Sequence, residues 1–362
     1  VRLDMSREMD QAVIEALCRY LEITPDRVFK SEAPLDLSFI FQIQDLLRKN
    51  SELFYEKRVP QKSPDFRENE SILDQIREED KLLSYPYESI RPFLKMLTEA
   101  AEDESVISIK MTLYRLAKQS KVVEALCEAA ENGKEVVVLV ELRARFDEEN
   151  NIIWARRLEE AGCHVIYGLM GLKTHAKIIL VVRKEADGIK RYVHLGTGNY
   201  NDNTAKLYTD MGLMTANDQF GSDASAFFNV LSGYSDPPVW NKLVMAPLGL
   251  RKKIYELIDN EISIVKKGGT GHIIAKMNSL IDYPVIQKLY EASMAGVKID
   301  LIIRGICGLR AGMDGISDNS RSQREHSRAL HCRKFPGTQP YFLVPGRRQG
   351  TAFPLQCRLD AA

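Results

Sequence analysis

Hydrophobic and polar positions along this chain form blocks whose character changes near residue 90. Before that point, Met9, Val13 and Leu17 fall at helical spacing, and the polar, proline-bearing stretch 58–88 shows no sustained period. From about Ile90 onward, helical patterns alternate with short apolar runs. This alternation is typical of α/β units built on a largely parallel sheet.

The α/β region is predicted to contain a closely spaced series of strands and helices. Apolar runs predict strands at 106–111, 135–141, 165–167, 176–182 and 191–195. Amphipathic stretches predict helices at 121–132 and 151–161, ended by Gly133 and Gly162. Every apolar run is far shorter than the roughly 20 residues that span a bilayer. The sequence therefore predicts no transmembrane segment, and leaves peripheral membrane association open.

One strand–helix–strand pattern occurs twice. The run 110–112 (Lys-Met-Thr) recurs at 276–278 (Lys-Met-Asn), and the helix, its glycine stop and the next strand recur after it. The offset is 166 residues at the first match and 163 at the later ones. Two generic α/β units would share some of these apolar matches. The ordered series favours a duplicated α/β domain.

Charge and cysteine content narrow the class of protein. The 50 Lys and Arg balance the 50 Asp and Glu, which argues against a nucleic-acid-binding surface and requires any anion site to be a local cluster. Six cysteines without a C-x-x-C pair predict a reducing, cytoplasmic setting and no structural zinc.

The two ends of the sequence are unusual. The chain opens on Val1 without an apolar leader, which predicts a fragment with no secretory signal. Residues 319–362 carry seven Arg and one Lys against Glu325 and Asp360, and show neither a helical nor a strand period. They predict a basic, irregular tail.

The candidate chemistry centres on His175. It lies in the run 173–177 (Lys-Thr-His-Ala-Lys) before an apolar strand, and the next strand ends in the loop 196–199 (Gly-Thr-Gly-Asn). If 176–182 is a strand, His175 and Lys177 project from the same face. A neutral imidazole can attack phosphorus while an ammonium and loop amides stabilise the phosphoryl oxygens. A lone H-x-K is common by chance, but its combination with a glycine loop favours a site.

Arginines at strand ends form a second candidate cluster. Arg115 follows one predicted strand, Arg143 and Arg145 follow the next, and Arg304 ends the equivalent strand of the second repeat. Ligand crevices form at such carboxyl ends, and the guanidinium fork suits phosphate oxygens. Helix capping or pairing with carboxylates is the open alternative. Tyr208 is predicted either to contact a base or phosphate, or to pack in the core.

Four long motifs resemble the polyphosphate kinase 1 family. They span 107–115, 140–150, 171–177 and 196–201, and the resemblance runs from near the start to about Asn319. It implies an α/β fold with two duplicated phospholipase D-like domains preceded by a partial head domain and linker. The implied ranges are 1–85 for the head and linker, 86–245 for the first domain, 246–318 for a truncated second domain, and 319–362 for the tail.

The resemblance also implies the activity and the residues that perform it. The family transfers the ATP γ-phosphoryl group reversibly to inorganic polyphosphate through a phosphohistidine, with Mg²⁺ and ATP as cofactors. It implies ATP, ADP and polyphosphate as partners, and a homo-oligomer. His175 matches the family's nucleophile and His326 its second essential histidine. Beside them, Lys177 and Asn199 are predicted to stabilise the phosphoryl oxygens. Tyr208, Arg304 and His326 match nucleotide contacts, and Arg115 and Arg145 match the magnesium and phosphate site.

Two departures keep other functions open. Phospholipase D enzymes carry an Asp five residues after the H-x-K lysine, whereas this chain has Val182, which weakens a phosphodiesterase activity on lipid or nucleic acid. His326 follows Asn319 at a shorter distance than in the family. An inactive chain that only binds phosphate polymers is the third hypothesis.

Overall fold

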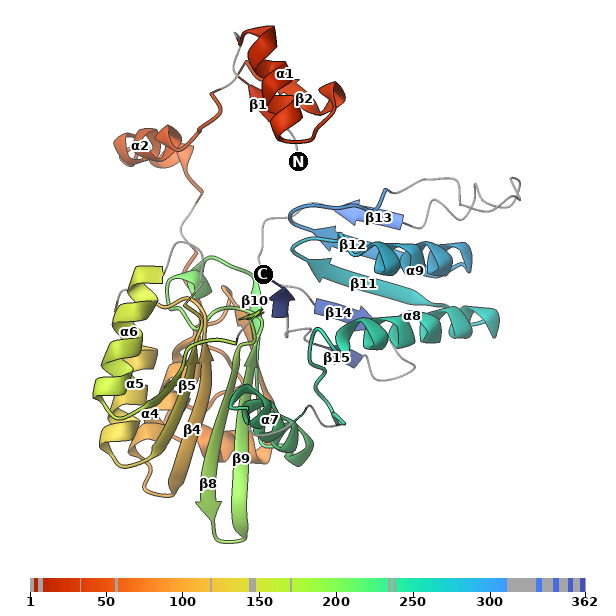
Figure 1. Cartoon of the computed structure of the whole chain (residues 1–362). Helices are drawn as coiled ribbons and strands as arrows, with labels where there is room; N and C mark the ends of the chain where they lie inside the picture. The colour runs from red at the N-terminus through yellow and green to blue at the C-terminus, as the bar shows by residue number, and fades with distance from the viewer. Residues whose placement is uncertain are drawn as a thin grey trace. The chain divides into compact units, whose positions relative to one another are not determined.

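The structure is a computed structural model, and it describes residues 3–5, 9–32, 34–55, 58–117, 119–142, 148–169, 171–233, 236, 239–310, 330–333, 341–344, 351–353 and 359–361. The chain divides into two compact units, residues 1–57 and 58–362. The outline of each unit can be followed in Figure 1.

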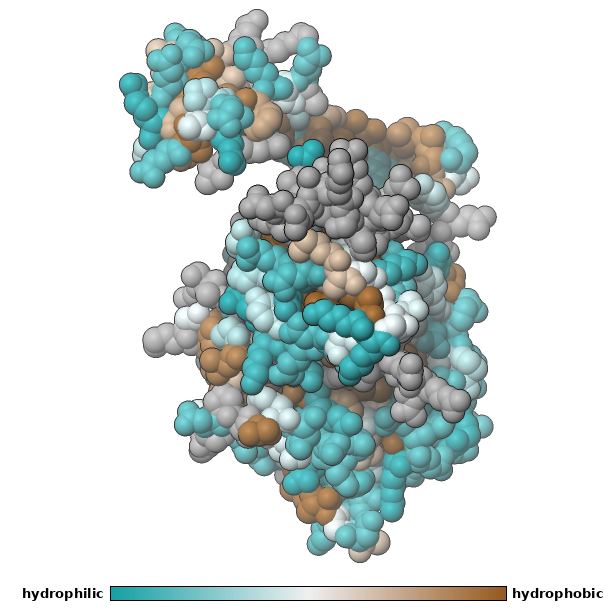
Figure 2. Space-filling model, turned by 90° about the vertical axis from the view of Figure 1, so that its right-hand side faces the viewer, coloured by the Kyte–Doolittle hydropathy of each residue, from teal (hydrophilic) through white to brown (hydrophobic). Residues whose placement is uncertain are grey.

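The N-terminal unit contains two short strands and two α-helices. β1 (Leu3–Met5) pairs in parallel with β2 (Val28–Lys30), and α1 (Gln11–Tyr20) lies between them in the sequence. The Asp10 side chain caps α1 by accepting a hydrogen bond from the amide of Ala12 at 2.8 Å. The apolar residues of α2 (Phe39–Leu46) are largely exposed, and hydrophobic surface on this unit is visible in Figure 2.

The second unit holds a seven-stranded sheet with the order β3-β10-β9-β8-β4-β5-β6. Its strands are β3 (Lys81–Tyr85), β4 (Val106–Leu113), β5 (Glu135–Val140), β6 (His164–Ile166), β8 (Ile178–Glu185), β9 (Gly188–Gly196) and β10 (Asp210–Thr215). Its helices are α3 (Ile72–Glu78), α4 (Arg91–Glu102), α5 (Lys121–Glu131), α6 (Glu148–Glu160) and α7 (Asp218–Leu231). We call this sheet and its helices the first α/β domain.

The α/β class is confirmed, but the prediction of a largely parallel sheet is wrong. Within the described part of this sheet, β4–β5 and β5–β6 pair in parallel, whereas β3, β10, β9, β8 and β4 are joined by antiparallel pairs. β8 and β9 form a hairpin whose register places Glu185 opposite Gly188, so two residues make the turn. So short a turn forces antiparallel pairing.

The sheet of the first α/β domain is covered on both faces. Side chains alternate along β8, so that Ile179 and Val181 join the core under α3–α6, while Ile178 and Leu180 join a separate core under α7. Figure 1 shows α4, α5 and α6 together and α7 apart from them. This two-sided burial explains why β8 reads as a continuous apolar run.

A second α/β domain repeats part of the first. β11 (His272–Met277) pairs in parallel with β12 (Lys298–Ile303), and α9 (Tyr283–Met294) connects them beside α8 (Leu250–Lys266). In both repeats a polar side chain caps the connecting helix: Ser120 before α5 and Asp282 before α9. Each helix is followed by a glycine with positive φ, Gly133 at 79° and Gly296 at 92°. The predicted duplication is confirmed at the level of these elements.

The tail contains strands that the sequence pattern did not predict. β13 (Leu330–Arg333), β14 (Tyr341–Val344) and β15 (Thr351–Phe353) extend the sheet of the second α/β domain to the order β13-β12-β11-β14-β15. β16 (Leu359–Ala361) pairs with β7 (Leu172–Thr174) of the first domain. Strands of three or four residues are too short to show an alternation of apolar and polar positions. They form because their backbone pairs with an existing edge of the sheet.

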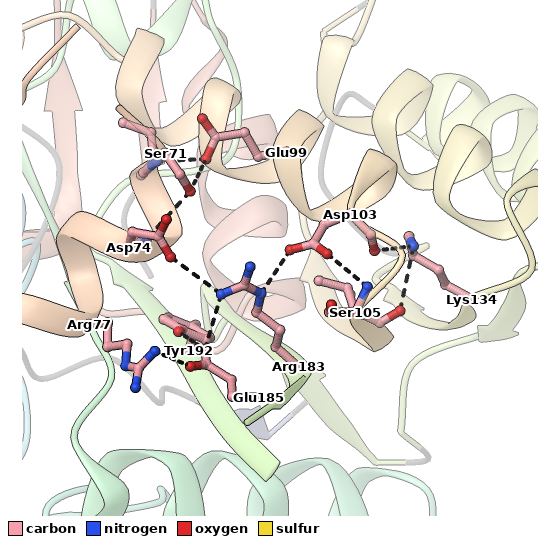
Figure 3. Close-up of polar contacts among 12 residues, drawn as sticks. Ser71, Asp74, Arg77, Glu99, Asp103, Ser105, Lys134, Arg183, Glu185 and Tyr192 are labelled. Carbon is pink, nitrogen blue, oxygen red and sulfur yellow. Dashed lines mark hydrogen bonds and ion pairs between the residues drawn. The ribbon is translucent and has the colours of Figure 1, made fainter. Parts of the chain in front are cut away.

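Figure 3 shows a polar network that joins helix α3 to the turn end of the β8–β9 hairpin, the end opposite residue 178. Arg183 donates to Asp103 at 2.8 Å and pairs with Asp74 and Glu185 at 3.3 and 3.2 Å. Glu185 also accepts a hydrogen bond from the hydroxyl of Tyr192. These contacts join α3, the residue that follows α4 and both strands of the hairpin, so the role of the network is to hold these elements together.

Among the described residues, no helix is both long enough and apolar enough to cross a lipid bilayer.

Candidate functional site

The segment that carries His175 is fixed to the end of β4. The buried Thr112 hydroxyl donates to the carbonyl of Ala176 at 2.7 Å and accepts from the amide of Ile178 at 3.2 Å. β8 begins only at Ile178, so the prediction that 176–182 is one strand is wrong at its start. The Thr112 side chain replaces the backbone ladder there, and the chain can leave the sheet before residue 178.

Although they lie outside β8, His175 and Lys177 are close together. The Lys177 ammonium donates to the carbonyl of His175 at 2.5 Å, and its side chain is only 2% exposed. The His175 ring is half-buried. The structure thus brings the predicted imidazole and ammonium together by a side chain-to-backbone contact instead of by strand alternation.

The ring of Tyr114 lies at the centre of this cluster. Its centroid is 4.7 Å from that of the His175 ring, with the two planes at 75°. Lys177 Nζ lies 4.9 Å from the same centroid, Lys173 Nζ 5.6 Å and Arg115 Cζ 5.9 Å. Three cationic side chains and one imidazole therefore converge on one aromatic ring, which is an arrangement suited to a multiply charged anion.

Buried polar side chains hold the strand ends that carry this cluster. Asn151 Nδ2 donates to the carbonyl of Tyr114 at 2.8 Å and to that of Glu141 at 3.0 Å. The Glu141 carboxylate accepts from the amide of Thr174 at 2.8 Å, next to His175. Because Asn151 and Glu141 are at most 3% exposed, these bonds lie away from water and fix the ends of β4 and β5 relative to the segment 172–177.

The glycine loop after β9 packs directly against this segment. The amide of Gly196 donates to the carbonyl of Lys177 at 2.9 Å. A Cβ at Gly198 would lie 2.5 Å from Asp210 Oδ2, so only glycine fits there without displacement. The Thr197 hydroxyl donates to Asp210 Oδ1 at 3.1 Å. The loop is therefore held between the His175 segment and the start of β10.

Three buried oxygen atoms in the glycine loop and in the residues that carry or hold the cluster have no hydrogen-bond partner within the described part of the chain. They are Oδ1 of Asn199 in the glycine loop, Oγ1 of Thr174 beside His175 and Oδ1 of Asn151. Buried polar atoms are nearly always satisfied in folded proteins, so each of these deserves an explanation. A bound group that donates hydrogen bonds would satisfy the first two.

The Asp210 carboxylate interacts electrostatically with two lysines, one from each α/β domain. Burial raises the pKa of the Asp210 carboxyl, and the Thr197 hydrogen bond and the charges of Lys276 and Lys177 oppose that rise. Burial also lowers the pKa of Lys276, which donates to Thr209 Oγ1 at 2.8 Å and to the Thr209 carbonyl at 3.3 Å. Lys276 of β11 therefore reaches the residue that follows Tyr208.

A buried aromatic layer supports the strands beneath the glycine loop. The His194 ring packs 4.7 Å from that of Phe93, and His194 Nδ1 lies 3.0 Å from the hydroxyl of Tyr200. Burial lowers the pKa of His194 to about 3, so this imidazole is neutral at pH 7. The residue therefore packs in the domain core as an uncharged side chain.

The remaining candidates are placed apart from the His175 cluster or fall outside the description. Tyr208 is exposed after the short helix at Thr204–Lys206. Arg304 follows β12, and its guanidinium donates to Asn278 Oδ1 at 2.8 Å. Arg145 and His326 lie outside the described residues, so the structure does not test their predicted places.

The described residues do not fit a magnesium ion held by protein side chains. Within the described ranges, no three His, Cys, Asp or Glu side chains come together in a way that could hold a metal. Arg115 has no lone pair to offer a cation. A role for Mg²⁺ here would require ligands from phosphate oxygens.

Several residues that build the site were not singled out from the sequence. Tyr114 stands in a quoted motif next to Arg115, and Lys276 opens the second copy of a repeat, so both had a visible signal. Glu141 stands in the quoted motif 140–150 and Asn151 opens a predicted helix, but neither position indicated a hydrogen-bond partner. Their roles depend on hydrogen bonds across 33 and 37 residues of sequence.

Two family models match the chain. Residues 71–237 match the polyphosphate kinase C-terminal domain 1, and residues 243–343 match the polyphosphate kinase C-terminal domain 2. The two matches together cover most of the chain.

The chain is also similar to individual polyphosphate kinases. It is 54% identical over 323 residues to one from Halalkalibacterium halodurans, covering 89% of this chain and 46% of that protein. It is 52% identical over 319 residues to one from Lactiplantibacillus plantarum, covering 88% and 44%. The crystal structure of polyphosphate kinase from Porphyromonas gingivalis matches with a TM-score of 0.75 and 31% identity, covering 97% of this chain and 52% of that one. The chain therefore spans about half the length of the relatives it matches.

Proposed function

Because the chain belongs to the polyphosphate kinase family, we propose that its first α/β domain transfers a phosphoryl group between ATP and inorganic polyphosphate through His175. One observation supports this most directly: the His175 ring packs against Tyr114 in a cluster with Lys173, Lys177 and Arg115. A nucleophile among fixed cations is what phosphoryl transfer requires of a protein.

The reaction consists of two displacements at phosphorus. In the first, an imidazole nitrogen of His175 forms a bond to the γ-phosphorus of ATP while the bond to the β,γ-bridging oxygen breaks and ADP leaves. In the second, a terminal oxygen of polyphosphate attacks the same phosphorus and the P–N bond breaks. Both steps run in reverse when polyphosphate phosphorylates ADP.

The surrounding side chains stabilise the charge on the transferred group. Arg115 and Lys173 neutralise the phosphoryl oxygens, and the Lys177 ammonium holds the His175 carbonyl while remaining next to the reacting ring. Asn199 takes part through its side-chain amide, whose NH₂ group can donate to a phosphoryl oxygen. Mg²⁺ would be held by the phosphate oxygens of ATP, since Arg115 has no lone pair to offer, and it would neutralise part of their charge; Arg115 and Arg145 would bind the phosphates themselves.

The other predicted contacts complete the proposal. Tyr208 and Arg304 contact the nucleotide, and His326 is the second histidine that acts on the phosphoryl group from the opposite side. The enzyme acts in the cytoplasm as a homo-oligomer. Val182 replaces the Asp of phospholipase D enzymes, which favours phosphoryl transfer over phosphodiester hydrolysis.

Phosphate labelling tests the proposal. Incubation of this chain with ATP labelled in the γ-phosphate is expected to leave acid-labile, base-stable label on the protein, because P–N bonds of phosphohistidine have that stability. His175→Ala should abolish the label, whereas the matched control His164→Ala, at an exposed histidine on β6, should retain it. Undiminished labelling of His175→Ala, or release of alcohol from a phosphodiester, would contradict the proposal.

A further inference from the structure

Tyr114 links the predicted nucleophile to the cations around it. The tyrosine and histidine rings meet nearly at right angles, with centroids 4.7 Å apart and planes at 75°. This edge-to-face arrangement is favoured by the quadrupoles of aromatic rings, and it restricts the rotation of both side chains.

The same ring also gathers positive charge. Lys177 Nζ, Lys173 Nζ and Arg115 Cζ lie between 4.9 and 5.9 Å from its centroid. Cations near an aromatic ring are attracted by its π-electrons, at distances up to about 6 Å. The ring therefore offsets some of the repulsion among these three charges, which would otherwise drive the side chains apart.

The backbone on either side of the ring contact is fixed independently. Asn151 Nδ2 donates to the carbonyl of Tyr114 at 2.8 Å, and Glu141 accepts from the amide of Thr174, the residue before His175. Asn151 is fully buried and also donates to the carbonyl of Glu141. With both backbones held, the Tyr114 ring contacts the His175 ring from a fixed position and contributes to its orientation.

We propose that Tyr114 is a positioning residue that fixes the angle of the His175 imidazole and keeps Lys173 and Lys177 at the phosphoryl site. This inference rests on the proposed role of His175 as the nucleophile. The contact belongs to the aromatic ring, so the ring should be required and the hydroxyl dispensable.

Two substitutions separate the ring from the hydroxyl. Tyr114→Leu removes the ring and is expected to lower the maximal single-turnover rate of His175 phosphorylation by roughly twofold to tenfold. Tyr114→Phe keeps the ring and should restore the wild-type rate. Since positioning acts on the chemical step, the rate at saturating ATP should fall more than the apparent affinity for ATP. A Tyr114→Leu rate equal to that of the wild type, or an equal loss in Tyr114→Phe, would overturn the proposal.

A spectroscopic readout keeps the test independent of activity and of variant stability. With ¹³C-labelled histidine, the Cε1 proton of His175, assigned by its loss in His175→Ala, should show a ring-current shift in the wild type and in Tyr114→Phe. The shift should disappear in Tyr114→Leu. An unshifted His175 signal in the wild-type chain would refute the ring contact. If His175→Ala keeps its phosphate label while this shift is present, the proposed function fails and the positioning contact stands.

Discussion

The buried histidine His194 should make the stability of the first α/β domain depend on pH. Burial lowers its pKa to about 3 from an ordinary value of 6.5. Between these two values the unfolded chain binds a proton that the folded chain does not, so the free energy of unfolding falls as the pH falls. From pH 7 to pH 5 the expected loss from this group is about 2 kcal/mol, at 1.36 kcal/mol per pKa unit.

Urea unfolding monitored by tryptophan fluorescence measures this loss. The two tryptophans, Trp154 and Trp240, both pack in cores of the first α/β domain, so their emission reports on the domain that contains His194. His194→Gln should be less stable at pH 7, because its contact with Tyr200 changes. Its free energy of unfolding should nevertheless fall by about 2 kcal/mol less than that of the wild type between pH 7 and pH 5.

The comparison needs a matched histidine because other groups titrate over the same range. His164→Gln removes an exposed histidine from β6 of the same domain and should leave the wild-type pH dependence intact. The reasoning is refuted if His194→Gln loses as much stability as the wild type between pH 7 and pH 5. It is also refuted if a titration of labelled histidines shows His194 gaining a proton near pH 6 in the folded chain.

Substitutions at three further positions test the site and the segment after α7. Gly198→Ala places a methyl group against the carboxylate of Asp210 and should lower phosphate labelling, measured as label per chain, by at least tenfold. Normal labelling would show that the loop can move. Asp223→Ala removes the buried acceptor of three backbone amides after α7. Urea titration should show that the free energy of unfolding falls by about 3 kcal/mol, and a fall of less than about 1 kcal/mol would contradict this reasoning. Glu141→Leu leaves the amide of Thr174 without its acceptor and should reduce labelling, whereas Glu141→Gln should retain most of it; equal effects would mean that the carboxylate does not position the segment.

The sequence determined the α/β class and the duplication, and it predicted His175, Lys177 and Arg115 as site residues. Strand and helix periods are local properties, so the ranges predicted for α5, β4 and β5 differ from the observed bounds by at most two residues. The motif around His175 gained weight from the glycine loop at 196–199, since a lone H-x-K is common by chance. The resemblance to polyphosphate kinases rested on four motifs, of which this is one.

The tertiary structure decided how those residues meet. His175 and Lys177 come together outside β8 because the Thr112 side chain ends the backbone ladder, and no local pattern in 173–177 encodes a bond to a residue 64 positions earlier. The antiparallel pairing of β4 with β8 and the contact of Lys276 with Thr209 are likewise long-range. Periodicity reports which face of an element is apolar, whereas the partner of a buried polar group depends on which strands and loops the whole fold brings together.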